Sequence, residues 1–532
     1  MSDGSYRLAG TIMLALGLLA SPAGPAAAQD DMLVLTRGND TIAVERVRRT
    51  GLRFEGELLV IPLRARFNYS AVINMGGVIT RMENEVRRGD ADPGSGPQQS
   101  ATLRFEGDSV IVESRAEAGA VRTQRLKTRA GALPYMNPSF AMLEPLLLRL
   151  RLAGGDSTQV PMFMLAGGQT VDVTVVRRGP DSVLVSFGQG NVGHYKVDSQ
   201  NRILGGRIPS QGLTVTRSRA TGQALFMSKP DYSAPRGAPY TATDVTIPTP
   251  MGHSLAGTLT LPRGRGPFPA VVTITGSGAQ DRDEEIPLVK GYRPFRQLAD
   301  TLARAGIAVL RMDDRGFGGS GGNLATATSQ DFAADIKAGL TWLRSRREID
   351  ARRLGLLGHS EGGLIGPMLA AEDPALAALV IMAGPSQTGR EILTFQNRYL
   401  IEHSPNIPAA SRDSALQAAL RGIDTAAKAN PWLRFFLDYD PKKTAARVKI
   451  PTLILQGATD QQVTPNQAEE LARAIRAGGN RDVTLRVFPN ANHLFVQDST
   501  GNPTGYANRA SAQVRGDVVE TLVGWLRAKL RR

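Results

Sequence analysis

Residues 354–363 read Leu-Gly-Leu-Leu-Gly-His-Ser-Glu-Gly-Gly, a short apolar run followed by a serine between glycines. This order, followed by a helical pattern of small residues, is typical of a nucleophile elbow, a sharp strand-to-helix turn that exposes a reactive serine. Gly358 and Gly362 fit such a turn, because side chains two positions before and after Ser360 would collide with neighbouring backbone. The pattern is short, and in a chain with 57 glycines an ordinary Gly/Ser turn is the alternative.

An acid and a histidine follow Ser360 in the order that this site requires. Residues 451–460 read Pro-Thr-Leu-Ile-Leu-Gln-Gly-Ala-Thr-Asp, a buried strand whose following loop carries Asp460. Residues 483–488 form another strand pattern, and the loop after it leads to His493. The chain has five histidines, of which only His493 lies beyond Asp460. Because α/β-hydrolases carry nucleophile, acid and histidine in this order, we predict a triad of Ser360, Asp460 and His493.

Each predicted site residue has a chemical role. Ser360 attacks a carbonyl carbon, His493 takes and returns the serine proton, and Asp460 fixes the imidazole. The backbone N–H of Glu361, at the start of the next helix, is expected to bind the oxyanion. A second donor is expected in the loop after the apolar run 270–275, where we favour the N–H of Ser277, with Gly278 as the alternative.

These motifs resemble those of a known family. Residues 276–284 read Gly-Ser-Gly-Ala-Gln-Asp-Arg-Asp-Glu, and 313–320 read Asp-Asp-Arg-Gly-Phe-Gly-Gly-Ser. Together with 358–363, 383–385 and the Asp460 segment, they resemble bacterial α/β-hydrolases of the dienelactone hydrolase and prolyl-oligopeptidase-like group. The resemblance covers about residues 241–532. It implies an α/β-hydrolase fold and a carboxylesterase-type activity without a cofactor, and it does not identify the substrate.

The first 28 residues have the features of a secretory signal peptide. Arg7 precedes an apolar stretch at 8–20, and three alanines end at Ala28, where we expect cleavage before Gln29. The apolar stretch is short for a membrane-spanning helix, although an uncleaved anchor is the alternative. We therefore expect a periplasmic or secreted protein without a stable membrane span after cleavage.

Composition excludes several function classes. The net charge is +14, but the basic residues are scattered and aromatic residues make up only 5%, so no stacking platform for nucleic acid is present. The absence of cysteine excludes disulfides and thiolate metal sites. Asp281, Asp283 and Glu284 lie in the expected oxyanion loop without a nearby histidine, and we predict no metal there.

Residues 29–225 differ from the rest of the chain. Short runs that alternate apolar and polar residues, such as 41–47, 109–113 and 171–176, predict an antiparallel β-rich domain, a curved sheet or partly open barrel. Residues 140–150 predict a helix that starts or kinks at Pro145 and covers the apolar face of the sheet. A lipid-binding groove is the alternative role for this helix. No family resemblance is evident here.

Residues 226–240, rich in proline, predict a stiff linker. Strand and helix patterns then alternate over 241–532, as expected for a mostly parallel sheet with helices on both faces. Residues 385–448 interrupt that alternation and predict a helical cap above the serine. Four of its aromatic side chains are candidates for lining the acyl pocket, with core packing as the alternative: Trp432, Phe435, Phe436 and Tyr439.

The Asp313–Arg315 segment ends a central strand near the same edge. We expect Asp314 and Arg315 to form a structural ion pair that shapes this loop, and contact with substrate is the alternative. The function that fits the whole pattern is an exported serine hydrolase that cleaves small carboxylic esters through an acyl-enzyme. A serine peptidase with the same triad, and a lipid- or glycan-binding protein with a degenerate hydrolase scaffold, are the alternatives. The sequence does not give the oligomeric state.

Overall fold

The computed structural model describes residues 29–91, 94–116, 121–188, 191–220, 225–286, 289–404, 407–509 and 511–531. The predicted signal peptide, residues 1–28, lies outside these ranges. The chain divides into two compact units, with the boundary between Phe226 and Met227, and the short stretch Ile61–Arg64 grouped with the second unit.

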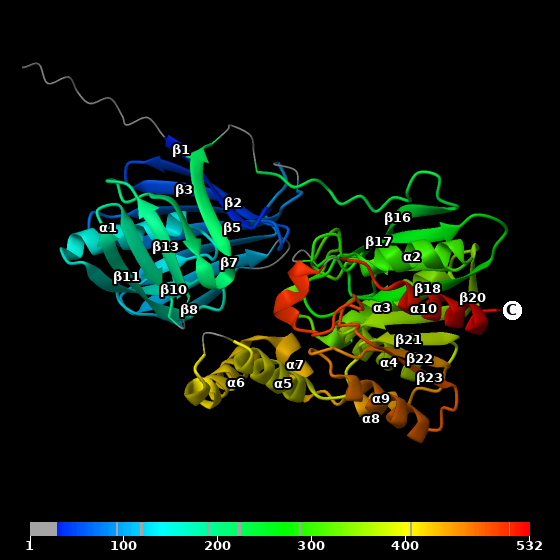
Figure 1. The fold of residues 1–532 in the computed structure, drawn as a ribbon. Helices are drawn as coiled ribbons and strands as arrows, with labels where there is room; N and C mark the ends of the chain where they lie inside the picture. Colours follow the sequence, from blue (N-terminus) through cyan, green and yellow to red (C-terminus); the bar gives the residue numbers. More distant parts are fainter. Residues whose placement is uncertain are drawn as a thin grey trace, which may run out of the picture. The chain divides into compact units, whose positions relative to one another are not determined.

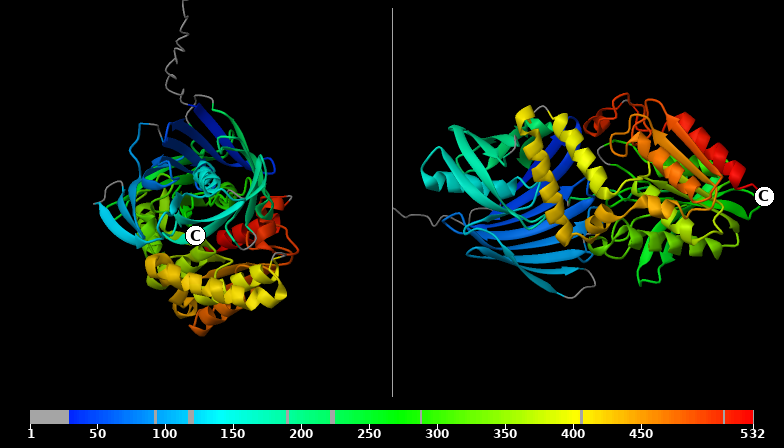
Figure 2. Two further views of the ribbon diagram at one scale, coloured as in Figure 1. Left: turned by 90° about the vertical axis from the view of Figure 1, so that its left-hand side faces the viewer. Right: turned by 90° about the horizontal axis from the view of Figure 1, so that it is seen from below.

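The N-terminal unit is one curved β-sheet wrapped around a helix (Figure 2). Its described residues form fifteen strands, and every neighbouring pair is antiparallel except β9 and β10. β1 pairs with β15, so the first and last strands of the unit lie side by side. The prediction of an antiparallel curved sheet is confirmed. The strands are β1 (Gln29–Arg37), β2 (Asp40–Thr50), β3 (Arg53–Val60), β4 (Ala65–Ile73), β5 (Ile79–Arg88), β6 (Gln99–Glu106), β7 (Ser109–Ala116), β8 (Arg122–Lys127), β9 (Leu133–Tyr135), β10 (Ser157–Met164), β11 (Thr170–Gly179), β12 (Ser182–Ser186), β13 (Val192–Val197), β14 (Ile203–Ile208) and β15 (Leu213–Arg219).

The helix enclosed by this sheet is α1 (Glu144–Ala153), which follows a single 3-10 turn at Ala141–Leu143. Leu146, Leu147 and Leu150 pack in the core formed by the alternating inward residues of the strands, whereas Leu152 is exposed. Glu45 on β2 is buried there, and its carboxylate accepts hydrogen bonds from the N–H groups of Phe140 (2.8 Å) and Ala141 (3.1 Å). Unpaired N–H groups at a helix start favour a negative partner, so Glu45 anchors the helix inside the sheet.

The C-terminal unit contains a mostly parallel sheet with helices on both faces (Figure 1). Its described residues form eight strands in the order β16-β17-β19-β18-β20-β21-β22-β23, of which β16 and β17 are antiparallel to their neighbours. The strands are β16 (Tyr240–Pro248), β17 (Ser254–Pro262), β18 (Phe268–Ile274), β19 (Ala308–Met312), β20 (Ile349–His359), β21 (Ala378–Met382), β22 (Thr452–Gly457) and β23 (Val483–Phe488).

Two apolar layers pack on the faces of this sheet. One contains residues of α3, α4 and α9, and the other contains residues of α2 and α10. This arrangement confirms the predicted α/β-hydrolase fold. The helices are α2 (Pro294–Arg304), α3 (Ser329–Arg344), α4 (Glu361–Glu372), α5 (Gly389–Glu402), α6 (Arg412–Ala429), α7 (Pro431–Asp438), α8 (Pro441–Ala445), α9 (Pro465–Ala477) and α10 (Gly516–Lys529).

Four consecutive helices, α5 to α8, lie between β21 and β22 and correspond to the predicted cap segment. α5 and α7 begin with a side chain that accepts a hydrogen bond from the first turn, Thr388 for α5 and Asn430 for α7. Such N-caps stabilise helix starts by about 1 kcal/mol each.

Candidate active site

Ser360 occupies a strained turn between β20 and α4. Its φ is +54° and its ψ is −115°, a conformation that L-residues rarely adopt. A Cβ at Gly358 would lie 2.0 Å from the carbonyl oxygen of Gly362, and one at Gly362 would lie 2.0 Å from that of Ile274. Glycine is therefore required on both sides of Ser360 by direct contact with backbone, as the motif predicts.

The three predicted triad residues lie together at the carboxyl ends of β20, β22 and β23. His493 Nε2 is 3.1 Å from Ser360 Oγ, and His493 Nδ1 is 2.8 Å from Asp460 Oδ2. Asp460 is fully buried and His493 is 5% exposed, whereas Ser360 is half-buried. A hydrogen-bonded line from a carboxylate through an imidazole to a serine is the geometry in which the serine proton can be removed.

The loop after β18 lies against the nucleophile. A Cβ at Gly276 would be 3.3 Å from Ser360 Cβ, while the N–H of Gly276 donates to Glu284 Oε1 at 2.8 Å. That N–H is therefore engaged away from the reaction centre. The following N–H groups, of Ser277 and Gly278, remain the predicted oxyanion donors from this loop, opposite the N–H of Glu361.

Glu361, directly after the nucleophile, has a buried carboxyl group with three side-chain partners. It accepts from Ser329 Oγ at 2.6 Å, from Trp432 Nε1 at 2.8 Å and from the side chain of Ser277. Burial raises the pKa of Glu361, and the three hydrogen bonds oppose that rise. Glu361 thus joins the loop after β18, the turn at Ser360 and helix α7.

The four aromatic candidates of the cap occupy different places. Trp432 reaches Glu361 and stacks on Phe436 with ring centres 5.1 Å apart, and Phe436 is a buried core residue. Phe435 stacks on Tyr439 at 5.1 Å, and the Tyr439 hydroxyl lies 2.5 Å from Thr444 Oγ1. Among the four, Trp432 is the one whose contacts connect it to the nucleophile turn.

Sequence reasoning was wrong about the partners of Asp314 and Arg315. Asp314 accepts from Thr275 Oγ1 at 2.7 Å and from the N–H of Gln280 at 2.9 Å, which holds the oxyanion loop. Arg315 turns instead to Asp335 on α3, at 2.6 Å. Both residues lie beyond the end of β19, Arg315 in a turn, and their side chains have different partners.

Sequence reasoning also gave no role to Arg282, which holds the loop after β18 in place. Its guanidinium binds both carboxylate oxygens of Asp313 at 2.9 Å and donates to the carbonyl of Gly257 at 2.8 Å. It also lies 4.2 Å from the ring centre of Tyr232, whose hydroxyl donates to Asp281 at 3.0 Å. Such a buried, bidentate pair is the strong form of an ion pair.

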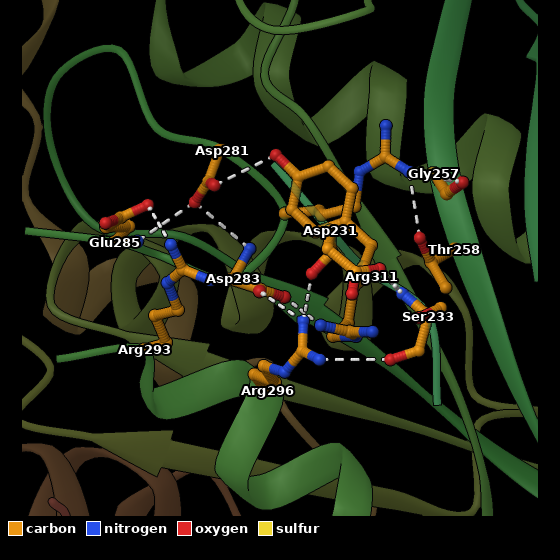
Figure 3. A network of polar contacts seen from close by, with 12 residues as sticks. Asp231, Ser233, Gly257, Thr258, Asp281, Asp283, Glu285, Arg293, Arg296 and Arg311 are labelled. Atoms are coloured by element: carbon orange, nitrogen blue, oxygen red, sulfur yellow. Dashed lines mark hydrogen bonds and ion pairs between the residues drawn. The ribbon is translucent and has the colours of Figure 1, made fainter. Parts of the chain in front are cut away.

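Further charged residues form polar contacts with the same loop, among them Asp283, Arg296 and Arg311 (Figure 3). Arg311 on β19 pairs with buried Asp283, and burial lowers the pKa of Arg311 to about 10. Arg296 on α2 donates to the carbonyls of Asp231 and Ser233. Residues 231–233 of the predicted linker are therefore bound to the C-terminal unit.

Arg282→Met is expected to destabilise the C-terminal unit by about 3–5 kcal/mol, because it leaves the buried Asp313 carboxylate without its cation. Urea unfolding followed by circular dichroism measures this loss. The matched control is Arg390→Met, which removes a half-exposed ion pair with Asp424 and should cost about 1 kcal/mol or less. Equal midpoints for the two variants would show that the Arg282 network contributes no more than a surface pair.

A serine on a strand-to-helix elbow, with an acid and a histidine on later strand ends of a mostly parallel sheet, defines the α/β-hydrolases. Comparisons with known proteins agree with this class. Residues 289–500 match the family model described as serine aminopeptidase, S33. The C-terminal unit has the fold of the α/β-hydrolases, and the matched family and the relatives give the enzyme class as serine hydrolase.

Relatives include both esterases and peptidases. Esterase EstD of Thermotoga maritima is 28% identical over 309 residues, covering 56% of this chain and 69% of the relative. Dipeptidyl aminopeptidase BIII of Pseudoxanthomonas mexicana is 27% identical over 297 residues, covering 53% of this chain and 39% of the relative. Among solved structures, an esterase of Pyrococcus furiosus has a TM-score of 0.39 at 18% identity, covering 56% of this chain and 96% of its own.

Two features of the described residues bear on cofactors and membranes. Within the part of the chain that the structure describes, no group of three or more His, Asp or Glu side chains is arranged to hold a metal ion. Across the same described ranges, no helix is long and apolar enough to cross a membrane.

Proposed function

We propose that this protein is an exported carboxylesterase that cleaves small esters through an acyl-enzyme on Ser360. The observation that carries the proposal is the line of hydrogen bonds from Asp460 through His493 to Ser360 Oγ, at 2.8 and 3.1 Å. In the proposed reaction Ser360 attacks the ester carbonyl while its proton passes to His493. His493 then returns that proton to the departing alcohol, and water releases the acid by the same route.

The proposed oxyanion donors are the N–H groups of Glu361 and Ser277, with Gly278 as the alternative to Ser277. The side chain of Ser277 already binds the Glu361 carboxyl, so the two donors belong to one hydrogen-bonded unit beside Ser360. Donors fixed before the reaction stabilise developing charge without reorganisation.

The preference for small esters rests on the cap. Trp432 hydrogen-bonds to Glu361, the residue after the proposed nucleophile, so its side chain lies beside the turn that carries Ser360. Its stacking partner Phe436 and the Phe435–Tyr439 pair stiffen this helix. We propose that Trp432 and its aromatic neighbours limit the acyl group to a few carbons. Export rests on the apolar segment at 8–20 and the alanines before Gln29.

A panel of p-nitrophenyl esters from acetate to laurate tests the function. We expect kcat/KM for the short chains to exceed that for laurate by about tenfold or more, because a closed apolar pocket discriminates by each added methylene. The full chain is expressed in a Gram-negative host, and the mass of the recovered protein shows whether residues 1–28 are removed. Folded protein that hydrolyses no ester of the panel would refute the esterase proposal.

A serine aminopeptidase is the second candidate, because the matched family model carries that description and one relative is a dipeptidyl aminopeptidase. An aminopeptidase needs carboxylates that bind the substrate amine, whereas Glu361, the acid beside Ser360, is buried among protein donors. Alanine p-nitroanilide and its N-acetylated form separate the two candidates. Turnover of the free-amine anilide, faster than that of the acetylated form and comparable with the esters, would favour the peptidase.

A further inference from the structure

His359, the residue before the nucleophile, has both ring nitrogens engaged in the protein interior. The ring is 4% exposed. Its Nδ1 is 2.8 Å from Glu284 Oε1, and its Nε2 is 2.9 Å from the backbone carbonyl oxygen of His493. Glu284 Oε1 also accepts from the N–H of Gly276 at 2.8 Å. One carboxylate oxygen and one imidazole therefore connect the oxyanion loop to the backbone of the proposed general base.

The partners of His359 define its protonation. A carbonyl oxygen only accepts, so Nε2 of His359 must carry a proton to make its bond to His493. Nδ1 faces an oxygen that already accepts a backbone N–H, so it is a donor as well. An imidazole that donates from both nitrogens is a cation, and Glu284 is then its anion. Oε2 of Glu284 is buried without a hydrogen-bond partner among the described residues, and it depends on that cation for compensation.

Glu284 itself is held in an unfavourable backbone conformation. Its φ is +56°, in the left-handed region that a non-glycine residue adopts only at a cost. Non-glycine residues in such conformations cluster at functional sites, where the surrounding structure enforces them. A buried ion pair need not stabilise the fold, because two well-packed apolar side chains at the same place often give equal or greater stability.

We propose that Glu284 and His359 form a positioning ion pair that fixes the oxyanion loop and the backbone of His493 relative to Ser360. This inference rests on the proposed function and adds two residues to it. Neither side chain touches the reacting atoms in this geometry. Their contribution is to hold Gly276 and His493 at a set spacing, and a shift of about 1 Å in such a constellation can cost about 10²-fold in rate.

The charge on His359 depends on its neighbours in a way that can be measured. Burial alone lowers the pKa of His359. This effect is outweighed by the charge and hydrogen bond of Glu284, by the carbonyl of His493 and by the charge of Asp460, so the pKa is raised. The His493 ring lies 5.0 Å away and the uncharged Phe495 ring 6.3 Å away. On the other side of Glu284 lies Tyr292, whose pKa is raised by burial and by the Glu284 charge.

The charge on His359 should make kcat depend on pH. A raised folded-state pKa means that the pair is intact below the pKa of His359 and is lost as the pH rises through it. Native kcat should therefore decline on the alkaline side at the His359 pKa. In Glu284→Gln the main raising cause is removed and burial lowers the pKa of His359. This variant has no ion pair to lose, so its alkaline decline should be absent.

Glu284→Gln in the full chain is the first test. We expect kcat on the preferred p-nitrophenyl ester to fall about 10²-fold, because the loop after β18 and the backbone of His493 lose their set spacing. KM should change little, because the cap residues proposed to bind the acyl group are untouched. His359→Gln keeps a side-chain N–H but no charge, and it should abolish the alkaline decline. The matched control is His253→Gln, which breaks another histidine–carboxylate pair of the same unit, with Asp335 at 3.1 Å. It should retain native kcat and pH profile.

The protonation of His359 is also readable without any substrate. With only five histidines, the ¹H–¹⁵N spectrum of histidine-labelled protein can be assigned by single substitutions. We expect both nitrogens of His359 to stay protonated to a higher pH in the native protein than in Glu284→Gln, because Glu284 raises the pKa of His359. A neutral native His359, or an active esterase whose Glu284→Gln variant keeps native kcat and pH profile, would overturn the inference. If no ester is cleaved while His359 is doubly protonated, the proposed function fails and the ion pair stands.

Discussion

Ser360→Ala is expected to reduce ester hydrolysis to the spontaneous rate, a loss of about 10⁴–10⁶ in kcat. The hydroxyl is the proposed nucleophile, and a methyl group can neither form the acyl-enzyme nor donate to His493 Nε2 at 3.1 Å. The fold should remain, because the Cβ stays in place and the strained φ of +54° is already accommodated by the glycines around it. Steady-state kinetics with the best ester of the panel measures the loss.

A covalent probe separates this loss from unfolding. A fluorophosphonate should add its mass once to the native protein, and the label should be absent from Ser360→Ala. The matched control is Ser386→Ala, which removes a buried serine between β21 and α5 that donates to Glu470. It should keep its label and most of its activity. Labelling of Ser360→Ala at native speed would show that another residue is the nucleophile.

The elbow, and the meeting of Ser360, Asp460 and His493 at one edge of the sheet, were predictable from turn contacts and strand order. Gly358 and Gly362 are required because a Cβ at either position would lie 2.0 Å from a backbone oxygen. This crowding arises from the strand-to-helix turn. Asp460 and His493 follow apolar runs that become parallel neighbours, β22 and β23. Carboxyl ends of parallel strands meet at one edge of the sheet, so chain order was enough to bring these residues together.

Partner choice over long range was not predictable in the same way. Three residues from separate segments meet at one place: Arg282 of the loop after β18, Asp313 at the end of β19 and Tyr232 of the segment after the unit boundary. No sequence pattern indicates that they are in contact. Arg315 follows Asp314 directly but binds Asp335 on α3. Sequence proximity suggested an ion pair, but each side chain has a partner distant in the sequence, Thr275 for Asp314 and Asp335 for Arg315.

His359 and Glu284 show the same limit at the site itself. Both stand in motifs that the sequence singles out, and the scarcity of histidine was a usable signal. The sequence does not show how the loop after β18 lies against the end of β20. That arrangement places Glu284 Oε1 between the N–H of Gly276 and the ring of His359. The N-terminal sheet is similar, because alternation predicted its strands but not the pairing of β1 with β15.

Asp460→Asn is expected to lower kcat about 10⁴-fold at neutral pH while the protein stays folded. All four contacts of the native carboxylate are with donors. Oδ1 accepts from the N–H groups of Gln462 (2.8 Å) and Val463 (3.0 Å), and Oδ2 accepts from Gln456 Nε2 (3.0 Å) and His493 Nδ1 (2.8 Å). The asparagine amide has one oxygen. The N–H groups of Gln462 and Val463 cannot reorient, so the amide oxygen will face them.

The NH₂ group that Asp460→Asn introduces then faces His493, and this reverses the tautomer. Nδ1 becomes the acceptor, so the single imidazole proton moves to Nε2, which faces Ser360 Oγ. A protonated Nε2 cannot take the serine proton, although every heavy atom is close to its native place. The loss should therefore appear in kcat with the unfolding midpoint in urea nearly unchanged. Asp350→Asn, a buried acid at the opposite end of β20, is the control and should retain native kcat. A kcat within about tenfold of native for Asp460→Asn would mean that another group orients His493.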